Sequence, residues 1–166
     1  MNTPGLVVYT IANDGRLYAS RTDLAGCTNN ALIPGGFAPS GFPVAVQTGT
    51  GTDDVFLSGS GKVVKVQVTY NAGATCAITF NTAPAGWTSP TVASPSALMT
   101  SDATPYFLYV GSSDGHLYKI NPTTGANAAN RLVRAGATIG DPSYDSATQK
   151  FYVGDSTGRI YSFDLF

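Results

Sequence analysis

Four basic or potentially basic residues follow turn glycines at matching places in the sequence: Arg16, Lys62, His116 and Arg159. Cations that project from neighbouring turns could form a ring that holds an acidic ligand, a sulfated glycan or a protein partner. Exposed hairpin positions also favour long polar side chains, so basic residues can collect there without a ligand. We favour this second explanation and keep the four residues as candidate ligand-binding positions.

His116 is the only histidine, and it lies one residue after a turn. A Ser-His-Asp site needs an imidazole that touches a nucleophile and is oriented by a buried carboxylate. We expect His116 to be solvated beside its turn, which does not meet these requirements. We therefore predict no catalytic residue and no enzyme.

Acidic residues offer a metal site only where several of them converge. Asp14, Asp114 and Asp155 each lie in a turn that their own side chain can cap, whereas calcium needs six to eight converging oxygens. Asp53 and Asp54 are adjacent, so we expect them to point apart in a solvated loop. One histidine and two cysteines cannot complete a zinc set. We predict no metal and no cofactor.

Aromatic residues are the remaining candidates for binding. Tyr18, Tyr118 and Tyr161 recur at one register, where they could stack on sugars, although packing between repeats is the explanation that we favour. Trp87 lies among Pro, Gly and Ser in APAGWTSP. An exposed Trp87 would be a binding anchor, and a buried one would hold two repeats together. Both alternatives stay open.

The composition favours a secreted, periplasmic or cell-surface protein. Of 166 residues, 43% are hydrophobic and only 11% charged, against about 25% charged in an average soluble domain. The net charge of −1 predicts no nucleic-acid partner, and no apolar run reaches the roughly 18 residues of a membrane span. No signal peptide follows Met1, so a secretion signal would lie upstream of it. Cys27 and Cys76 could form one disulfide or stay as two partly buried thiols.

These residues are placed by an internal repeat. Residues 109–118 (YVGSSDGHLY) and 152–161 (YVGDSTGRIY) are nearly the same, and residues 9–18 (YTIANDGRLY) and 56–66 (FLSGSGKVVKV) align with them. Each segment predicts a hairpin, because apolar and β-branched arms flank a turn that contains glycine. The segments start about 40 to 50 residues apart, a period that is typical of propeller blades.

Two further strands are expected in each unit, one outside the hairpin and one leading into it. The lead-in strands are predicted within residues 42–48, 89–94 and 141–146. The resulting fold is an all-β propeller of four-stranded antiparallel blades in a single domain, 1–166. The blades span approximately residues 5–34, 35–83, 84–135 and 136–166, and the first and last are incomplete. The chain would then be part of a larger propeller or of a head-to-tail oligomer.

The units resemble the PQQ-like repeat of the quinoprotein alcohol dehydrogenase-like propellers. The resemblance is carried by YVGSSDGHLYKINPTTGA (109–126) and YVGDSTGRIYSFDL (152–165). It implies a propeller scaffold for most of the chain and is weak for function, since such propellers host unrelated tasks. That family usually has a tryptophan after the Thr-Gly turn, where this sequence has TGANAANRLV.

The sequence as a whole predicts a non-catalytic binding or structural module with a protein or carbohydrate partner. Recognition is expected in the variable connections, above all in residues 83–105. The alternative is a fragment of a PQQ-dependent oxidoreductase. The calcium-binding acidic cluster and adjacent cysteines that the resemblance implies for such enzymes are not found in the sequence.

Overall fold

The computed structural model of the chain describes residues 7–71, 75–96, 98–100 and 106–166. Every regular element in these ranges is a β-strand, as the all-β prediction requires. The strands are β1 (Val7–Ile11), β2 (Arg16–Arg21), β3 (Thr28–Leu32), β4 (Val44–Gly49), β5 (Thr52–Gly59), β6 (Lys62–Tyr70), β7 (Ile78–Asn81), β8 (Leu98–Thr100), β9 (Leu108–Gly111), β10 (His116–Ile120), β11 (Asn127–Leu132), β12 (Ser143–Asp145), β13 (Lys150–Gly154) and β14 (Ile160–Asp164).

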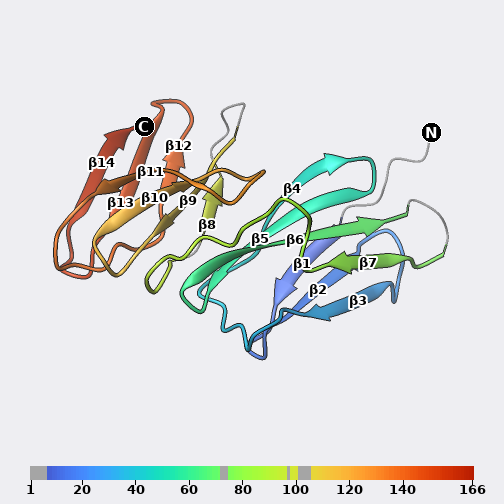
Figure 1. Cartoon of the computed structure of the whole chain (residues 1–166). Helices are drawn as coiled ribbons and strands as arrows, with labels where there is room; N and C mark the ends of the chain where they lie inside the picture. Colours follow the sequence, from blue (N-terminus) through green and yellow to red (C-terminus); the bar gives the residue numbers. More distant parts are fainter. Residues whose placement is uncertain (1–6, 72–74, 97, 101–105) are drawn as a thin grey trace.

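The strands form four antiparallel sheets that follow the chain order, and each sheet is one blade (Figure 1). Blade 1 contains β1, β2 and β3, and blade 2 contains β4 to β7. Blade 3 contains β8 to β11, and blade 4 contains β12, β13 and β14. Blades 1 and 2 lie on the right of Figure 1, and blades 3 and 4 lie on the left. The first and last blades have three strands each among the described residues, which agrees with the two incomplete units expected.

The central hairpin of each blade owes its shape to its turn residues. Asp114 accepts a hydrogen bond from the backbone N–H of His116 at 3.0 Å, as the capping prediction requires. Gly115 has a φ of +88°, and a Cβ there would lie 2.1 Å from the carbonyl oxygen of Arg134. Glycine is therefore needed both for the left-handed backbone and for the close approach of the next connection.

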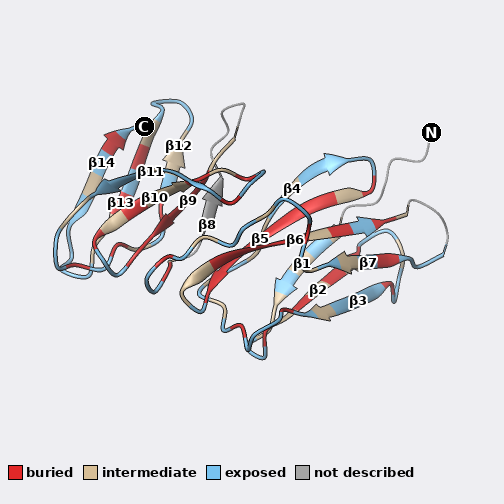
Figure 2. Ribbon diagram, in the orientation of Figure 1, coloured by how far each residue is buried: buried red, intermediate tan, exposed pale blue. Residues whose placement is uncertain are grey.

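The blades pack on one another through the apolar faces of their strands. We call the face of a blade that meets the preceding blade its leading face, and the opposite face its trailing face. Three clusters of buried residues separate the blades. Between blades 1 and 2 the cluster contains Leu17, Ala19, Val55, Leu57, Val64 and Val66. Between blades 2 and 3 it contains Phe56, Val63, Leu108, Val110 and Ile120. Between blades 3 and 4 it contains Tyr109, Leu117, Phe151, Val153 and Phe163. Figure 2 shows these buried positions concentrated on the central strands.

Each outer strand is followed by a connection that is bonded to two hairpins. The connection first donates to the turn glycine of its own blade, through Ile33 to Gly15, Val92 to Gly61 and Val133 to Gly115. It then accepts from a serine of the next hairpin, through Ala38 from Ser60, Ala93 from Ser113 and Thr138 from Ser156. Neighbouring hairpins are thereby tied together at one end of the blades.

The strand predicted within residues 89–94 is wrong. Thr91 makes only an isolated bridge with Lys62, and the lead-in strand of blade 3 is instead β8. The reason is that Val92 donates to Gly61 while Pro90 accepts from Val63, so this segment belongs to the connection over the β5–β6 turn. The other two lead-in strands form within their predicted ranges, as β4 and β12, with β4 one residue longer at its end.

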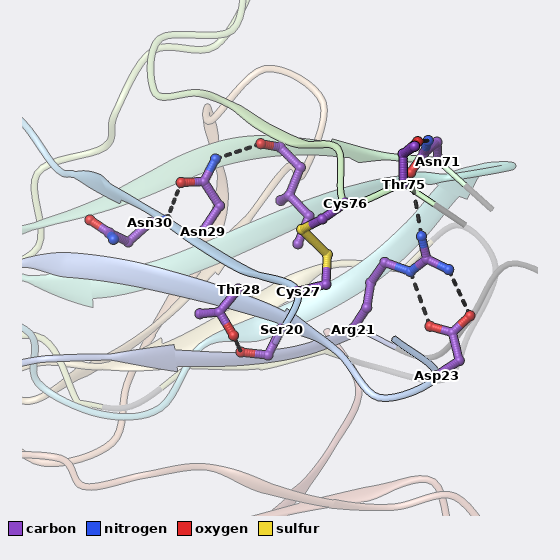
Figure 3. Close-up of a disulfide and its surroundings, with 11 residues drawn as sticks. Ser20, Arg21, Asp23, Cys27, Thr28, Asn29, Asn30, Asn71, Thr75 and Cys76 are labelled. Atoms are coloured by element: carbon purple, nitrogen blue, oxygen red, sulfur yellow. Dashed lines mark hydrogen bonds and ion pairs between the residues drawn. A yellow bond between two sulfur atoms is a disulfide. The ribbon is translucent and has the colours of Figure 1, made fainter. Parts of the chain in front are cut away.

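A disulfide joins Cys27 to Cys76, which settles the alternative left open by the sequence (Figure 3). It links the starts of the outer strands of blades 1 and 2, with a Cα–Cα distance of 5.2 Å. Beside it, the Asn29 amide donates to the carbonyl oxygen of Ile78 at 2.7 Å. The outer edges of these two blades are therefore held together covalently.

Candidate functional site

The surface that best fits a binding role lies at the end of the blades where the central hairpins turn. We call it the hairpin-turn face and define it by turn residues 12–15, 60–61, 112–115 and 155–158 and by connections 33–43, 88–96 and 133–142. Phe42, just before the innermost strand of blade 2, is 85% exposed on this face. The hydrogen bonds between connections and turns make the surface around Phe42 well ordered.

The four candidate cations lie on this face, one on each blade. Arg16, Lys62 and His116 begin the strand after their turn, and Arg159 directly precedes β14. Two of them, Arg16 and His116, contact residues of their own blades. Arg16 donates to Asn30 at 2.8 Å and lies 3.6 Å from the Asp14 carboxylate. The Nζ atom of Lys62 lies near Gly35 in the connection between blades 1 and 2, 3.8 Å from the position that a Cβ on Gly35 would take. Arg159 is exposed.

His116 is less solvated than expected. Its side chain is 30% exposed, and Nδ1 lies 3.2 Å from Oδ1 of Asp114. Oδ2 of Asp114 accepts the Tyr118 hydroxyl at 2.6 Å, and this hydrogen bond, together with burial, raises the pKa of Tyr118 to about 12. Burial acts to raise the pKa of Asp114, but the hydrogen bonds that it accepts outweigh burial and lower it. The carboxylate is thus used to hold its own hairpin, with the imidazole beside it.

Blade 4 repeats this arrangement with an arginine in place of the imidazole. Asp155 accepts the Tyr161 hydroxyl at 2.8 Å, and Arg134 approaches the same carboxylate oxygen at 3.7 Å. Burial acts to raise the pKa of Asp155, but accepted hydrogen bonds, led by that of the Thr157 hydroxyl, hold it well below its usual value. An open pocket of about 460 Å³ adjoins this group; its lining residues are Thr138, Gly140, Asp141, Gly154, Asp155 and Ser156.

The recurring tyrosines mostly serve packing. Tyr118 packs against the cluster between blades 2 and 3, and Tyr161 packs against the cluster between blades 3 and 4. Tyr18 is the corresponding residue on the leading face of blade 1, where no blade precedes it among the described residues. The tyrosine–aspartate pairs within the hairpins were not expected from the sequence. Asp114 lies 4 residues before Tyr118, whereas Asp155 lies 6 residues before Tyr161, so the two pairs share no constant spacing that could have indicated them.

Trp87 holds two blades together. It is half-buried, packs against the cluster between blades 2 and 3, and its ring lies 5.7 Å from that of Phe56. A Cβ on Gly125 would lie 3.2 Å from the indole, and Thr88 donates to Thr124 at 2.9 Å. Trp87 thus reaches the Thr124-Gly125 turn of blade 3 from the connection between blades 2 and 3. Of the two alternatives left open for Trp87, the structure shows the one in which the indole holds two repeats together.

Asp53 and Asp54 do not lie in a solvated loop, and that prediction is wrong. Both are 6% exposed within β5, where adjacent side chains point to opposite faces as expected. Asp54 pairs with the Lys65 ammonium at 2.9 Å, and Asp53 accepts the Tyr9 hydroxyl at 2.6 Å from blade 1. Burial is tolerated because each carboxylate has such a partner. Lys65 lies 11 residues from Asp54 on the neighbouring strand β6, and Tyr9 lies 44 residues from Asp53, so no pattern within β5 itself indicates this environment.

Among the described residues, no three His, Cys, Asp or Glu side chains come together as metal ligands could. The described part of the chain also contains no helix with the length and apolar character needed to cross a membrane.

Comparison with known proteins shows the fold. No protein-family model and no curated protein matches the sequence. BamB from Moraxella catarrhalis is structurally similar with a TM-score of 0.56 and 19% identity, over 95% of this chain and 42% of that one. The Cps50 (Swd1) β-propeller domain from Myceliophteria thermophila is similar with a TM-score of 0.59 and 9% identity, over 96% of this chain and 49% of that one. The chain therefore spans less than half of either structure, and its four packed sheets are propeller blades.

Proposed function

We propose that the chain is a non-catalytic binding module, with a PQQ-like repeat, of a secreted, periplasmic or cell-surface protein. Its partner is a protein or a glycan that docks on the hairpin-turn face. The observation that carries the proposal is Phe42, an aromatic side chain that is 85% exposed on connections fixed by backbone hydrogen bonds. An exposed aromatic on a rigid support is typical of a binding anchor, because little side-chain entropy is lost on docking.

The positions of the basic residues support a contact role and not a catalytic one. Arg16 and His116 lie beside Asp14 and Asp114, and the Asp155 carboxylate is occupied by donors of its own blade. These groups shape the turns. Arg159 and Lys62 extend the polar surface around them, which suits an acidic or polar partner at the rim.

The disulfide supports the proposed compartment. Disulfides persist in oxidising surroundings and are rare in the cytosol. Cys27–Cys76 closes a loop of 49 residues between two blades, so it has a structural position. Together with the low content of charged residues, it favours a secreted, periplasmic or surface location.

A photo-crosslinking experiment tests the proposal. The photoreactive residue p-benzoylphenylalanine is placed at position 42, with position 79, an exposed residue of outer strand β7, as the matched control. In the extracellular fraction of the source organism, we expect a crosslinked partner from position 42 only, with binding reduced by Phe42→Ala. A glycan array with the same variant tests the carbohydrate class. Equal crosslinking from both positions together with a blank array, or dye-linked alcohol oxidation by the chain with pyrroloquinoline quinone and calcium, would contradict it.

A further inference from the structure

Blade 4 exposes a face that is built like the trailing faces of the other blades. Each trailing face has an aromatic residue on the first hairpin strand and an aliphatic residue at or next to the start of the second. The pairs are Tyr9 with Leu17, Phe56 with Val63, Tyr109 with Leu117, and Tyr152 with Ile160. In the first three blades the aliphatic residue is 0% exposed, whereas Ile160 is 80% exposed and Tyr152 is 39% exposed.

Blade 1 exposes the complementary face. Val8 occupies the position that Phe151 has in blade 4, and Tyr18 occupies that of Tyr161. Phe151 is 0% exposed against blade 3, whereas Val8 is 46% exposed. The leading face of blade 1 is therefore an inter-blade surface without a blade against it among the described residues.

The internal interfaces show which positions would meet. The ring of Tyr109 on the trailing face of blade 3 lies 4.2 Å from the ring of Phe151 on the leading face of blade 4. By the same register, Tyr152 on blade 4 would meet Val8 on a blade 1. The leading face carries the hydroxyls of Thr10 and Ser20, and the trailing face carries that of Ser162. The charged residues on these faces are Arg16, which lies 3.6 Å from the Asp14 carboxylate, and Lys150 and Asp164, which pair with each other at 3.1 Å. Each charge therefore has a partner within its own blade.

We propose that a second copy of this chain docks the leading face of its blade 1 on the trailing face of blade 4, head to tail. Two copies would then close one ring through two identical contacts. The contact continues the arrangement of the three internal interfaces, and it covers Val8, Tyr152 and Ile160 together. A ring of two copies would be comparable in length to the two similar propeller structures, of which one copy covers 42% and 49%. A two-fold contact between two blade 4 faces would leave Val8 uncovered.

Sedimentation velocity and light scattering at micromolar concentration test the proposal. We expect the wild-type chain to have twice the 17.1 kDa mass of one copy. Ile160→Asp should give a monomer with an unchanged circular-dichroism spectrum, because Ile160 supports no core in the single chain. Phe42→Asp is the matched control, since Phe42 is equally exposed but lies on neither face. This variant should remain a dimer and lose only the partner proposed above, so the two proposals fail separately.

The head-to-tail arrangement has its own test. Val8→Asp should also give a monomer, and mixing the Val8→Asp and Ile160→Asp chains should restore a dimer of one chain of each kind, because one contact between wild-type faces is then available. A wild-type monomer over the whole concentration range would overturn the proposal. A dimer that survives Val8→Asp but not Ile160→Asp would overturn it as well, in favour of a two-fold contact between blade 4 faces.

Discussion

Removing the Cys27–Cys76 disulfide tests the idea that the first two blades depend on a covalent tie. The bond closes a loop with a sequence separation of 49. In the chain-entropy treatment, a loop of this length raises the free energy of unfolding by about 4 kcal/mol at 25 °C. The side chain of Cys27 is buried, so alanine is the better replacement because serine would bury a hydroxyl.

We expect the double variant Cys27→Ala/Cys76→Ala to lose about 4 kcal/mol in urea unfolding, with Tm lower by about 8 to 16 °C for a chain of this size. Unfolding can be followed by Trp87 fluorescence and by circular dichroism. The matched control is the wild-type chain with and without dithiothreitol. The reduced wild type should approach the double variant, and the double variant should not respond to the reagent.

A loss of less than about 1 kcal/mol in the free energy of unfolding would refute the reasoning. It would mean that the apolar cluster alone holds blades 1 and 2 together, or that the unfolded chain is equally restricted without the disulfide. An intermediate loss with separate transitions by the two probes would instead show that blade 1 unfolds independently.

Three further predictions concern contacts between side chains. Lys65→Met should cost about 3 to 5 kcal/mol in urea unfolding, since it leaves the Asp54 carboxylate buried without its ammonium, and Asp54→Leu/Lys65→Met should recover most of that loss; equal losses in the single and double variants would contradict this. Trp87→Ala should lower the free energy of unfolding by about 3 kcal/mol, since it opens the contact between blades 2 and 3. A loss near zero would argue against a role for Trp87 in holding these blades together. Acidification should lower the free energy of unfolding as the pH falls below about 4. The folded-state pKa values of Asp114 and Asp155 lie below their values in the unfolded chain, so the unfolded chain binds more protons in this acidic range. The stability that the two carboxylates contribute above about pH 4 is therefore lost as they become protonated. Asp155→Asn should flatten this pH dependence of the free energy of unfolding.

Much of each hairpin follows from local sequence. Asp114 and Gly115 specify a turn through a side-chain cap and a left-handed glycine, and both act within a few residues. Period-two alternation then assigns the flanking strands to two faces, which is why the central strands lie where the repeat places them. The lead-in strand of blade 3 was misplaced because Val92 and Thr91 have strand-forming side chains, whereas their backbone bonds go to the β5–β6 turn.

The candidate site is less accessible to such reasoning. The basic residues after the turns can be located from spacing, but their pairing with Asp14, Asp114 and Asn30 depends on side-chain direction. Phe42 gave no signal, since a single aromatic in a Ser-Gly-Phe-Pro segment can be buried or exposed. Its exposure is a consequence of where the connection between blades 1 and 2 crosses the hairpin.

The sequence by itself determined the repeat, the hairpins and the propeller class, because turn chemistry and alternation are short-range properties of the chain. Only the tertiary structure decided that Cys27 meets Cys76, that Asp54 is buried against Lys65, and that Trp87 lies between two blades. It also decided that Ile160 is exposed while its counterparts Leu17 and Leu117 are buried. The physical reason is that burial and pairing depend on which side chains lie opposite. For Cys27, Trp87 and Leu17 these side chains come from a neighbouring blade, and for Asp54 the partner comes from the neighbouring strand of its own blade.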